Sequence, residues 1–232
     1  MARRDWMHAP QSAWENPVAL NYLTGQRGIN PKALAHVGGG LKFEADGPPW
    51  PDPPHDASTG EVYPSICSAM IRLNGGKGFE GVRAVHRTFL MPDGSNKARM
   101  PKAKRIYGAA RGCAIRLTKG WSRRGPERAT RDGVTGEVLA ISEGIEDGLT
   151  WAMIERTHRV WAAGSLSFIG AVEVPDCVEK IVLVGQNDDN PRVVEAFDKA
   201  VDQLIAASGK PCEIVRPPKP FKDWNDYWRA QV

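Results

Sequence analysis

Two short apolar segments, about forty residues apart, each end in acidic or amide side chains and then pass into a helical pattern. The first is residues 138–141, followed by Ser142-Glu143-Gly144, and the second is residues 181–184, followed by Gly185-Gln186-Asn187-Asp188-Asp189. Alternation of strands with helices favours a parallel sheet covered by helices. The carboxyl ends of neighbouring parallel strands share one edge, where such sheets bind ligands. The pattern therefore predicts an α/β fold with oxygen ligands gathered at that edge.

The second half of the chain, residues 137–232, has the full alternating pattern. Its expected strands are residues 137–142, 159–163, 180–185 and 212–215, and its expected helices are residues 145–157, 166–172 and 191–208. A short helix over residues 223–230 begins with Asp223 as its cap. These elements predict a four-stranded parallel sheet flanked by helices.

The first half, residues 17–136, has a strand-and-turn pattern typical of a small α+β lobe with an antiparallel sheet. Two short helices at residues 18–23 and 31–36 precede strands at 66–73, 81–90 and 112–117, with turns at 74–76 and 93–94. Residues 1–16 are interpreted as a tail or linker, and residues 119–136 as an exposed loop. Residues 47–60 contain seven Pro and Gly and predict a loop.

Charge is unevenly distributed along the chain, although the net charge is only +4. Between residues 97 and 131 there are twelve Lys and Arg residues against a single acid, Glu127. Such a stretch beside an acidic site suits an enzyme that acts on a polyanion, because phosphate contacts supply most of the affinity for nucleic acid. A solvated basic surface without a partner is the alternative.

The cysteines argue against a zinc module. Cys67, Cys113, Cys177 and Cys212 are widely spaced, and no Cys-x-x-Cys pair occurs. With no signal peptide and no long apolar segment in the sequence, we expect a cytoplasmic protein with reduced thiols and no membrane contact.

The segment Glu143-Gly144-Ile145-Glu146-Asp147 and the acid-rich strand end after residue 184 together resemble the Toprim domain of topoisomerases, bacterial-type primases and some nucleases. Further segments resemble the phage- and plasmid-type primase branch of that family, and the resemblance extends over roughly residues 17–230. These segments are Tyr22-Leu23 with Arg27-Gly28-Ile29, His86-Arg87-Thr88-Phe89-Leu90, and Lys222-Asp223-Trp224-Asn225-Asp226. Their order and spacing make the resemblance specific.

The resemblance implies that Glu143 is a metal-site acid and a general acid or base, and that Asp147 is the second acid of the motif. A structural alternative for Glu143 is a carboxylate that complements the helix dipole. Gly144 allows close backbone approach and favours the catalytic interpretation. Glu146 lies about a hundred degrees around the helix from Asp147 and is expected to face solvent.

At the second strand end the family usually has Asp-x-Asp, whereas this chain has Gln186-Asn187-Asp188. Gln186 still offers a carbonyl oxygen to a hard cation but carries no charge, which weakens metal binding. Asp188 and Asp189 remain as charged metal-binding candidates, and an Asn-Asp turn that ends the strand is the structural alternative.

The implied cofactor is Mg²⁺ or Mn²⁺, with no zinc expected, because Mg²⁺ prefers carboxylates, water and substrate phosphates. In a two-metal site one cation activates the attacking hydroxyl and the other neutralises the leaving pyrophosphate. Four basic residues are candidates for holding the template or the triphosphate, namely Arg87, Lys104, Arg105 and Arg116. Asn225 and Asp226 resemble the closing segment of primase-like chains, where packing or capping is as plausible as ligand contact.

Three functions fit the sequence. The first is a primase-like nucleotidyltransferase that makes short primers from nucleoside triphosphates on single-stranded DNA in phage or plasmid replication, with a replicative helicase or a separate zinc-binding protein as a partner. The second is a Toprim nuclease with the same metal site. The third is a nucleic-acid-binding protein that has lost catalysis, a reading supported by Gln186.

Overall fold

The computed structural model describes residues 6–7, 9, 11–45, 62–73 and 81–232. The loop predicted at residues 47–60 and the turn predicted at 74–76 lie outside the described residues. Within the described part, no helix combines the length and apolar character needed to cross a membrane.

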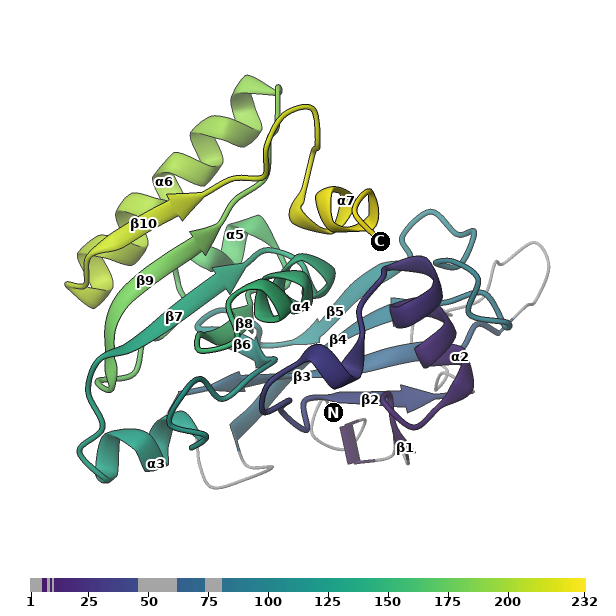
Figure 1. The fold of residues 1–232 in the computed structure, drawn as a ribbon, viewed down its shortest axis with the longest axis horizontal. Helices are drawn as coiled ribbons and strands as arrows, with labels where there is room; N and C mark the ends of the chain where they lie inside the picture. Colours follow the sequence, from purple (N-terminus) through teal and green to yellow (C-terminus); the bar gives the residue numbers. More distant parts are fainter. Residues whose placement is uncertain (1–5, 8, 10, 46–61, 74–80) are drawn as a thin grey trace.

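A single sheet of ten strands runs through the described residues (Figure 1). Its antiparallel part contains β1 (Gln11–Ser12), β2 (Leu41–Glu44), β3 (Ser65–Arg72), β4 (Val82–Phe89), β5 (Lys104–Gly108) and β6 (Cys113–Arg116). Its parallel part contains β7 (Glu137–Ser142), β8 (Arg159–Ala162), β9 (Val178–Val184) and β10 (Cys212–Val215), side by side in the order β8-β7-β9-β10. The predicted four-stranded parallel sheet and the antiparallel sheet before it are both confirmed.

The two parts of the sheet are joined because β6 pairs with β8 in antiparallel fashion, through Ile115 opposite Ala162 and Arg116 opposite Trp161. The sheet therefore continues across the boundary predicted at residues 136/137. Residues 11–13, placed in a tail by the sequence, instead belong to the fold, since β1 pairs with β2 and Ala13 is fully buried.

Helices cover both faces of the parallel strands (Figure 1). On one face lie α5 (Leu166–Ile169) and α6 (Pro191–Ser208), and on the other lie α4 (Ile145–Ile154) and α7 (Trp224–Arg229). Along β9, Ile181 and Leu183 pack in the cluster of α5 and α6, whereas Val182 and Val184 pack in the cluster of α4. This alternation with period two explains why the strand is apolar throughout, because both of its faces are buried.

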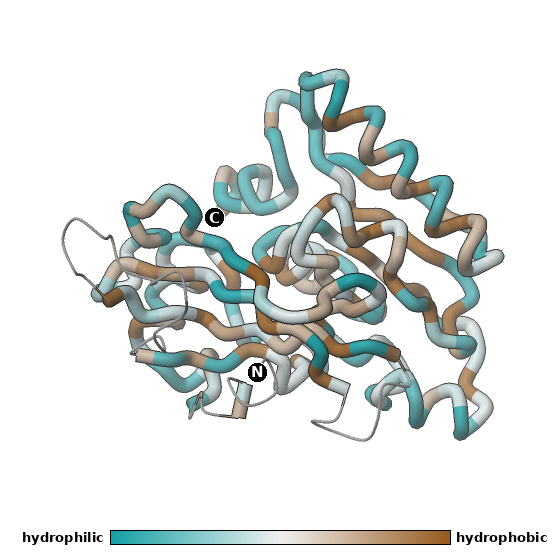
Figure 2. Tube along the Cα trace, turned by 180° about the vertical axis from the view of Figure 1, so that it is seen from behind, coloured by the Kyte–Doolittle hydropathy of each residue, from teal (hydrophilic) through white to brown (hydrophobic). Residues whose placement is uncertain are grey.

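The amphipathic pattern of α6 sets its orientation and its ends. Asn190 caps its first turn by accepting a hydrogen bond from the Arg192 backbone N–H at 3.0 Å, and Gly209 ends it with a φ of 64°. Ala200, Val201 and Leu204 are its buried residues, and the apolar stripe is visible from behind in Figure 2.

Four elements were not predicted, namely β1, β2, β5 and the helix α3. The helix α3 (Pro126–Arg131) lies within the expected loop at 119–136, and it starts with Pro126 after Gly125, which makes no side-chain cap. The strand β5 is partly exposed and pairs with β4 alone, so its sequence Lys-Arg-Ile-Tyr-Gly lacks the apolar run of an interior strand.

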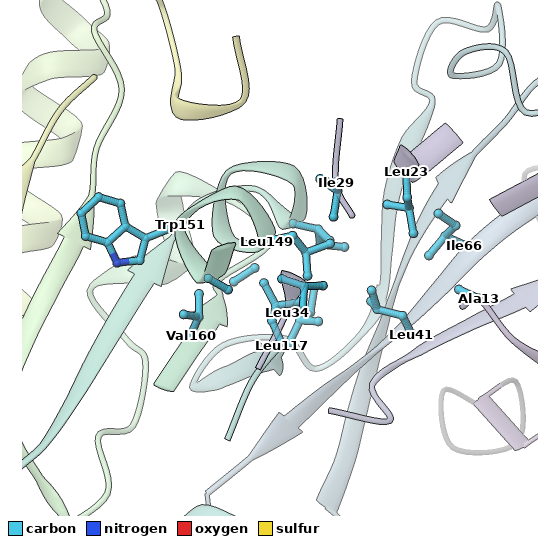
Figure 3. Packing of buried hydrophobic residues seen from close by; sticks show 14 of the residues in the cluster. Ala13, Leu23, Ile29, Leu34, Leu41, Ile66, Leu117, Leu149, Trp151 and Val160 are labelled. Carbon is cyan, nitrogen blue, oxygen red and sulfur yellow. The ribbon is translucent and has the colours of Figure 1, made fainter. Parts of the chain in front are cut away.

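The main core lies where α4 meets the N-terminal lobe. Leu149 of α4 is fully buried in one cluster with Leu23, Ile29, Leu34 and Leu117 (Figure 3). The helix comes close to the sheet at Gly148, where an added Cβ would lie 2.5 Å from Ser142 Oγ and 2.6 Å from Leu117 Cδ1. The lack of a side chain at residue 148 therefore sets how closely the two halves pack.

We expect Leu149→Ala to lower the free energy of unfolding by about 2–5 kcal/mol, because it leaves a cavity at the junction of both halves. Urea denaturation followed by circular dichroism measures the change. Ile205→Ala is the matched control on the exposed side of α6, where Ile205 is 40% exposed and the expected change is within about 0.5 kcal/mol. Equal effects of the two substitutions would contradict this account of the core.

Candidate active site

Glu143 and Gln186 lie at the same edge of the parallel sheet. Ser142, the last residue of β7, is in register with Val184, the last residue of β9, so the residues that follow the two strands emerge side by side. Glu143 and Gln186 both line a small polar cavity of about 130 Å³ that faces the N-terminal lobe. Both also line a larger cavity of about 570 Å³ between α5, α6 and the end of β9. The half-buried Glu143 thus stands between two cavities.

Asp147 is held by two hydrogen bonds. Its carboxylate accepts one from Gln186 Nε2 at 2.8 Å and one from the Asn225 backbone N–H at 3.1 Å. Burial and the nearby Asp223 carboxylate raise the pKa of Asp147 to about 7. Because both of its oxygens accept hydrogen bonds from protein groups, Asp147 fixes the positions of Gln186 and α7.

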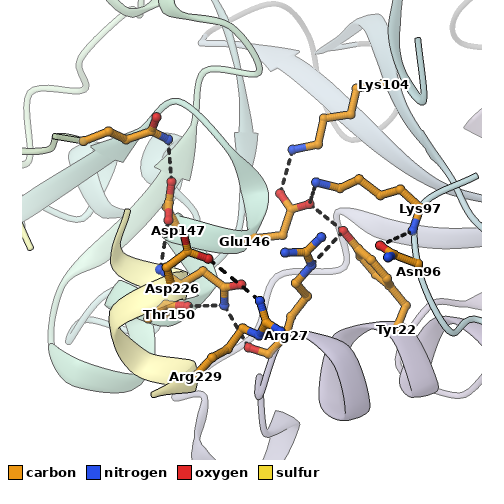
Figure 4. Close-up of polar contacts among 12 residues, drawn as sticks. Tyr22, Arg27, Asn96, Lys97, Lys104, Glu146, Asp147, Thr150, Asp226 and Arg229 are labelled. Carbon is orange, nitrogen blue, oxygen red and sulfur yellow. Dashed lines mark hydrogen bonds and ion pairs between the residues drawn. The ribbon is translucent and has the colours of Figure 1, made fainter. Parts of the chain in front are cut away.

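Asn225 lines the small cavity and also makes packing contacts. It is 2% exposed, and its Nδ2 donates to the Arg27 backbone oxygen at 2.8 Å and to Thr150 Oγ1 at 3.0 Å. It therefore ties α7 to α4 and to the N-terminal lobe. Asp226 lies on the half-exposed side of α7, where it pairs with Arg229 at 3.8 Å and lines neither cavity (Figure 4). The predicted cap is confirmed, since Asp223 accepts a hydrogen bond from the Asp226 backbone N–H at 2.7 Å.

The prediction that Glu146 faces solvent is wrong. Its side chain is buried and accepts a hydrogen bond from Tyr22 Oη at 2.7 Å, and it pairs with Lys97 Nζ at 3.0 Å and Lys104 Nζ at 2.9 Å (Figure 4). Burial alone would raise the pKa of Glu146, but the two lysines and the hydrogen bonds outweigh it and hold the pKa well below its usual range. Glu146 does not reach solvent because the N-terminal lobe covers this side of α4.

Of the four predicted basic contacts, Lys104 alone lines the small cavity. Arg105 follows it on β5, so it points to the opposite face of the sheet, where its guanidinium lies 6.0 Å from the centre of the Phe89 ring. Arg116 forms two hydrogen bonds with Glu127, at 2.6 and 3.0 Å, and lines a different cavity beside α3.

Arg87 is fully buried in β4, between β3 and β5, and therefore cannot contact a nucleic acid. It pairs with Glu44 and donates a hydrogen bond to Ser65 Oγ at 3.1 Å. Its assignment as a ligand-binding residue is corrected to a structural role.

Six residues that line the small cavity were not predicted as site residues, namely Arg27, His86, Lys97, Glu146, Gly164 and Asp223. Burial is the main reason that the pKa of His86 falls to about 4, so this imidazole is neutral at pH 7. The segments that contain Arg27 and His86 were singled out for their family resemblance, but no local signal placed their side chains at this edge.

The family comparisons agree with this architecture. Residues 1–117, half of the chain, match a family described as a domain of unknown function (DUF7146), and residues 138–232 match the Toprim domain. The chain belongs to the DUF7146 family and carries a Toprim domain. No curated protein matches it.

Several solved structures resemble this Toprim protein. The primase fragment of the bacteriophage T7 primase-helicase protein is 16% identical, with a TM-score of 0.44, over 74% of this chain and 60% of that one. The DnaG catalytic core is 14% identical, with a TM-score of 0.47, over 94% of this chain and 71% of that one. The DnaG primase catalytic domain bound to single-stranded DNA is 13% identical, with a TM-score of 0.45, over 94% of this chain and 72% of that one. The chain thus spans three fifths of the T7 fragment.

The oxygen ligands of this Toprim domain suit a cation that arrives with phosphates. In the described part of the chain, no group of three His, Cys, Asp or Glu side chains is placed to hold a metal ion. Glu143, Asp188 and Asp189 are the carboxylates that line the larger cavity. Asp188 Oδ1 accepts a hydrogen bond from the Asn190 backbone N–H at 2.9 Å, which is the turn interaction weighed as the alternative. Mg²⁺ commonly binds through one or two carboxylates plus substrate phosphates, so this ligand set fits it.

We expect Glu146→Gln to lower the free energy of unfolding at pH 7 by about 3 kcal/mol, because two lysines lose their buried partner. Glu195→Gln, on the exposed side of α6, is the control. Since the folded-state pKa of Glu146 is depressed, its stabilisation is present above the usual pKa of 4.5 and is lost as the pH falls through the folded value. Denaturation at several pH values should therefore show the difference shrinking below about pH 4.5. A difference that is independent of pH would contradict the assignment.

Proposed function

We propose that this Toprim protein is a primase-like nucleotidyltransferase that joins nucleoside triphosphates into short strands on single-stranded DNA, with Mg²⁺ as its cofactor. The observation that carries the proposal is the position of Glu143, whose carboxylate stands at a strand end between two cavities lined by cations. The Toprim match over residues 138–232 supports it.

The small cavity has the chemistry to receive phosphates. Arg27, Lys97 and Lys104 line it on the side of the N-terminal lobe. A lysine ammonium has three donors, and one of them satisfies Glu146, so further donors remain for a phosphate oxygen. Glu146 orients the two lysines and acts as a positioning residue.

We assign cation binding to the Glu143 carboxylate and the side-chain carbonyl oxygen of Gln186. When bound, Mg²⁺ would neutralise the charge of the reacting phosphates, which is the main catalytic requirement of phosphoryl transfer. Asp147 is a positioning residue, because its hydrogen bond from Gln186 Nε2 turns that amide so that the carbonyl oxygen is left free.

We expect Glu143→Gln to abolish strand synthesis, because it removes the metal-binding charge without changing the size of the side chain. Labelled nucleoside triphosphates, single-stranded DNA and Mg²⁺ or Mn²⁺ form the assay, and the products are separated by size. Glu195→Gln should synthesise strands like the wild type. Template cleavage in place of synthesis would identify a nuclease, and neither product with DNA binding retained would identify a non-catalytic binding protein.

Gln186→Glu tests whether residue 186 faces the cation. The new carboxylate would lie against Asp147, now 2.8 Å from the amide nitrogen, so we expect a lower melting temperature without Mg²⁺. Added Mg²⁺ should restore most of the loss, because a cation between the carboxylates removes their repulsion. Gln203→Glu on the exposed side of α6 should show neither effect. A melting temperature of Gln186→Glu that does not respond to Mg²⁺ would exclude a cation at this residue.

A further inference from the structure

The larger cavity has an apolar wall that the chemistry proposed for Glu143 does not use. We call it the α5–α6 cleft, and Leu166, Ile169, Val184 and Phe197 form its apolar wall. Its volume of about 570 Å³ lies in the range of small-molecule sites. Phe197 is half-buried on α6, where it packs against the core and also lines the cleft.

Gly185 lines the cleft next to Phe197 and Arg216. An added Cβ at Gly185 would lie 3.5 Å from Phe197 Cζ and 3.4 Å from Arg216 Cγ. A side chain at residue 185 would therefore contact both the Phe197 ring and the Arg216 side chain.

Arg216 and Lys219 are cations that line the cleft. The Arg216 guanidinium lies 5.4 Å from the centre of the Phe197 ring. In the described part of the chain, neither Arg216 nor Lys219 forms an ion pair. Asn187 holds the segment that contains Lys219, since its Nδ2 donates to the backbone oxygens of Pro217 and Phe221, both at 2.9 Å. Two unpaired cations on a fixed segment complement an anionic ligand.

We infer that the α5–α6 cleft binds a nucleotide, with its base against Phe197 and its phosphates toward Arg216 and Lys219. An aromatic ring stacks on any base, and Arg pairs well with phosphate oxygens. Because Glu143 lines the same cleft, a nucleotide bound here has its phosphates beside the proposed cation. The nucleotide is either a free nucleoside triphosphate or a unit of the DNA strand, and the inference rests on the proposed function for its substrate class.

The test is Phe197→Leu, which keeps an apolar side chain and removes the aromatic face. Fluorescence titrations with ATP, with labelled oligo-dT and with inorganic triphosphate measure binding to the full chain. The expected result is an affinity for ATP, for oligo-dT or for both that is about five- to a hundredfold weaker, since stacking contributes that much per base. Inorganic triphosphate, which has no base, should bind the variant and the wild type equally.

Three further variants sharpen the test. Phe197→Trp should keep or strengthen base binding, whereas Arg216→Gln should weaken ATP and inorganic triphosphate together. Ile205→Leu, on the same helix outside the cleft, should change nothing. Weakening of ATP alone identifies the free triphosphate as the occupant, and weakening of oligo-dT alone identifies the DNA strand.

Wild-type affinity of folded Phe197→Leu for both nucleotide probes would overturn the inference. Equal weakening of ATP and inorganic triphosphate binding by Phe197→Leu would overturn it as well. These outcomes are distinguishable from failure of the proposed function. If the wild type makes no strands while base binding still depends on Phe197, the cleft is a nucleotide site without polymerase chemistry. If strand synthesis depends on Glu143 while base binding is unchanged in Phe197→Leu, only the inference about the cleft is wrong.

Discussion

The buried charge of Glu146 determines how the two halves of the protein fit together. A carboxylate on the covered side of α4 needs partners, and its helix supplies none of them. Tyr22, Lys97 and Lys104 of the N-terminal lobe provide them. Separating the N-terminal lobe from the Toprim domain would leave Glu146, Lys97 and Lys104 without these partners. An unpaired charge in a buried site is energetically costly. The cavity beside Glu143 is therefore a product of the whole chain, although Glu143 itself lies in the Toprim domain.

The continuous sheet explains how the cations of the N-terminal lobe come to lie near Glu143 at the edge of the parallel sheet. Pairing of β6 with β8 aligns the antiparallel strands with the parallel ones, and β5 then carries Lys104 toward α4. Within the Toprim domain, α4 and the α5–α6 pair bury opposite faces of β7 and β9, and this double burial fixes the strand ends from which Glu143 and Gln186 emerge. The two strand ends thereby hold Glu143 and Gln186 at one edge of the sheet.

Local patterns were enough to predict the four parallel strands, the cap at Asp223 and the shared edge of Glu143 and Gln186, because each follows from periodicity or strand order. They were not enough for Glu146 or Arg87. A charged residue within a strand or helix gives no local sign of whether a distant segment covers it, and Tyr22 is 124 residues from its partner. The density of basic residues was also a poor guide to ligand contacts, because Arg116 in the basic stretch is paired with Glu127.

Gln186 is best understood through its neighbour. Burial and the nearby Asp223 carboxylate raise the pKa of Asp147 to about 7. A further negative charge beside the Asp147 carboxylate is therefore unfavourable. An aspartate at residue 186 would face that carboxylate and would depend on a cation to offset the repulsion. The amide of Gln186 instead donates a hydrogen bond to Asp147 and avoids that repulsion. Asp147 and Gln186 thus hold each other in place beside Glu143, and in the function proposed above the Gln186 carbonyl oxygen stays free to join Glu143 at the cation.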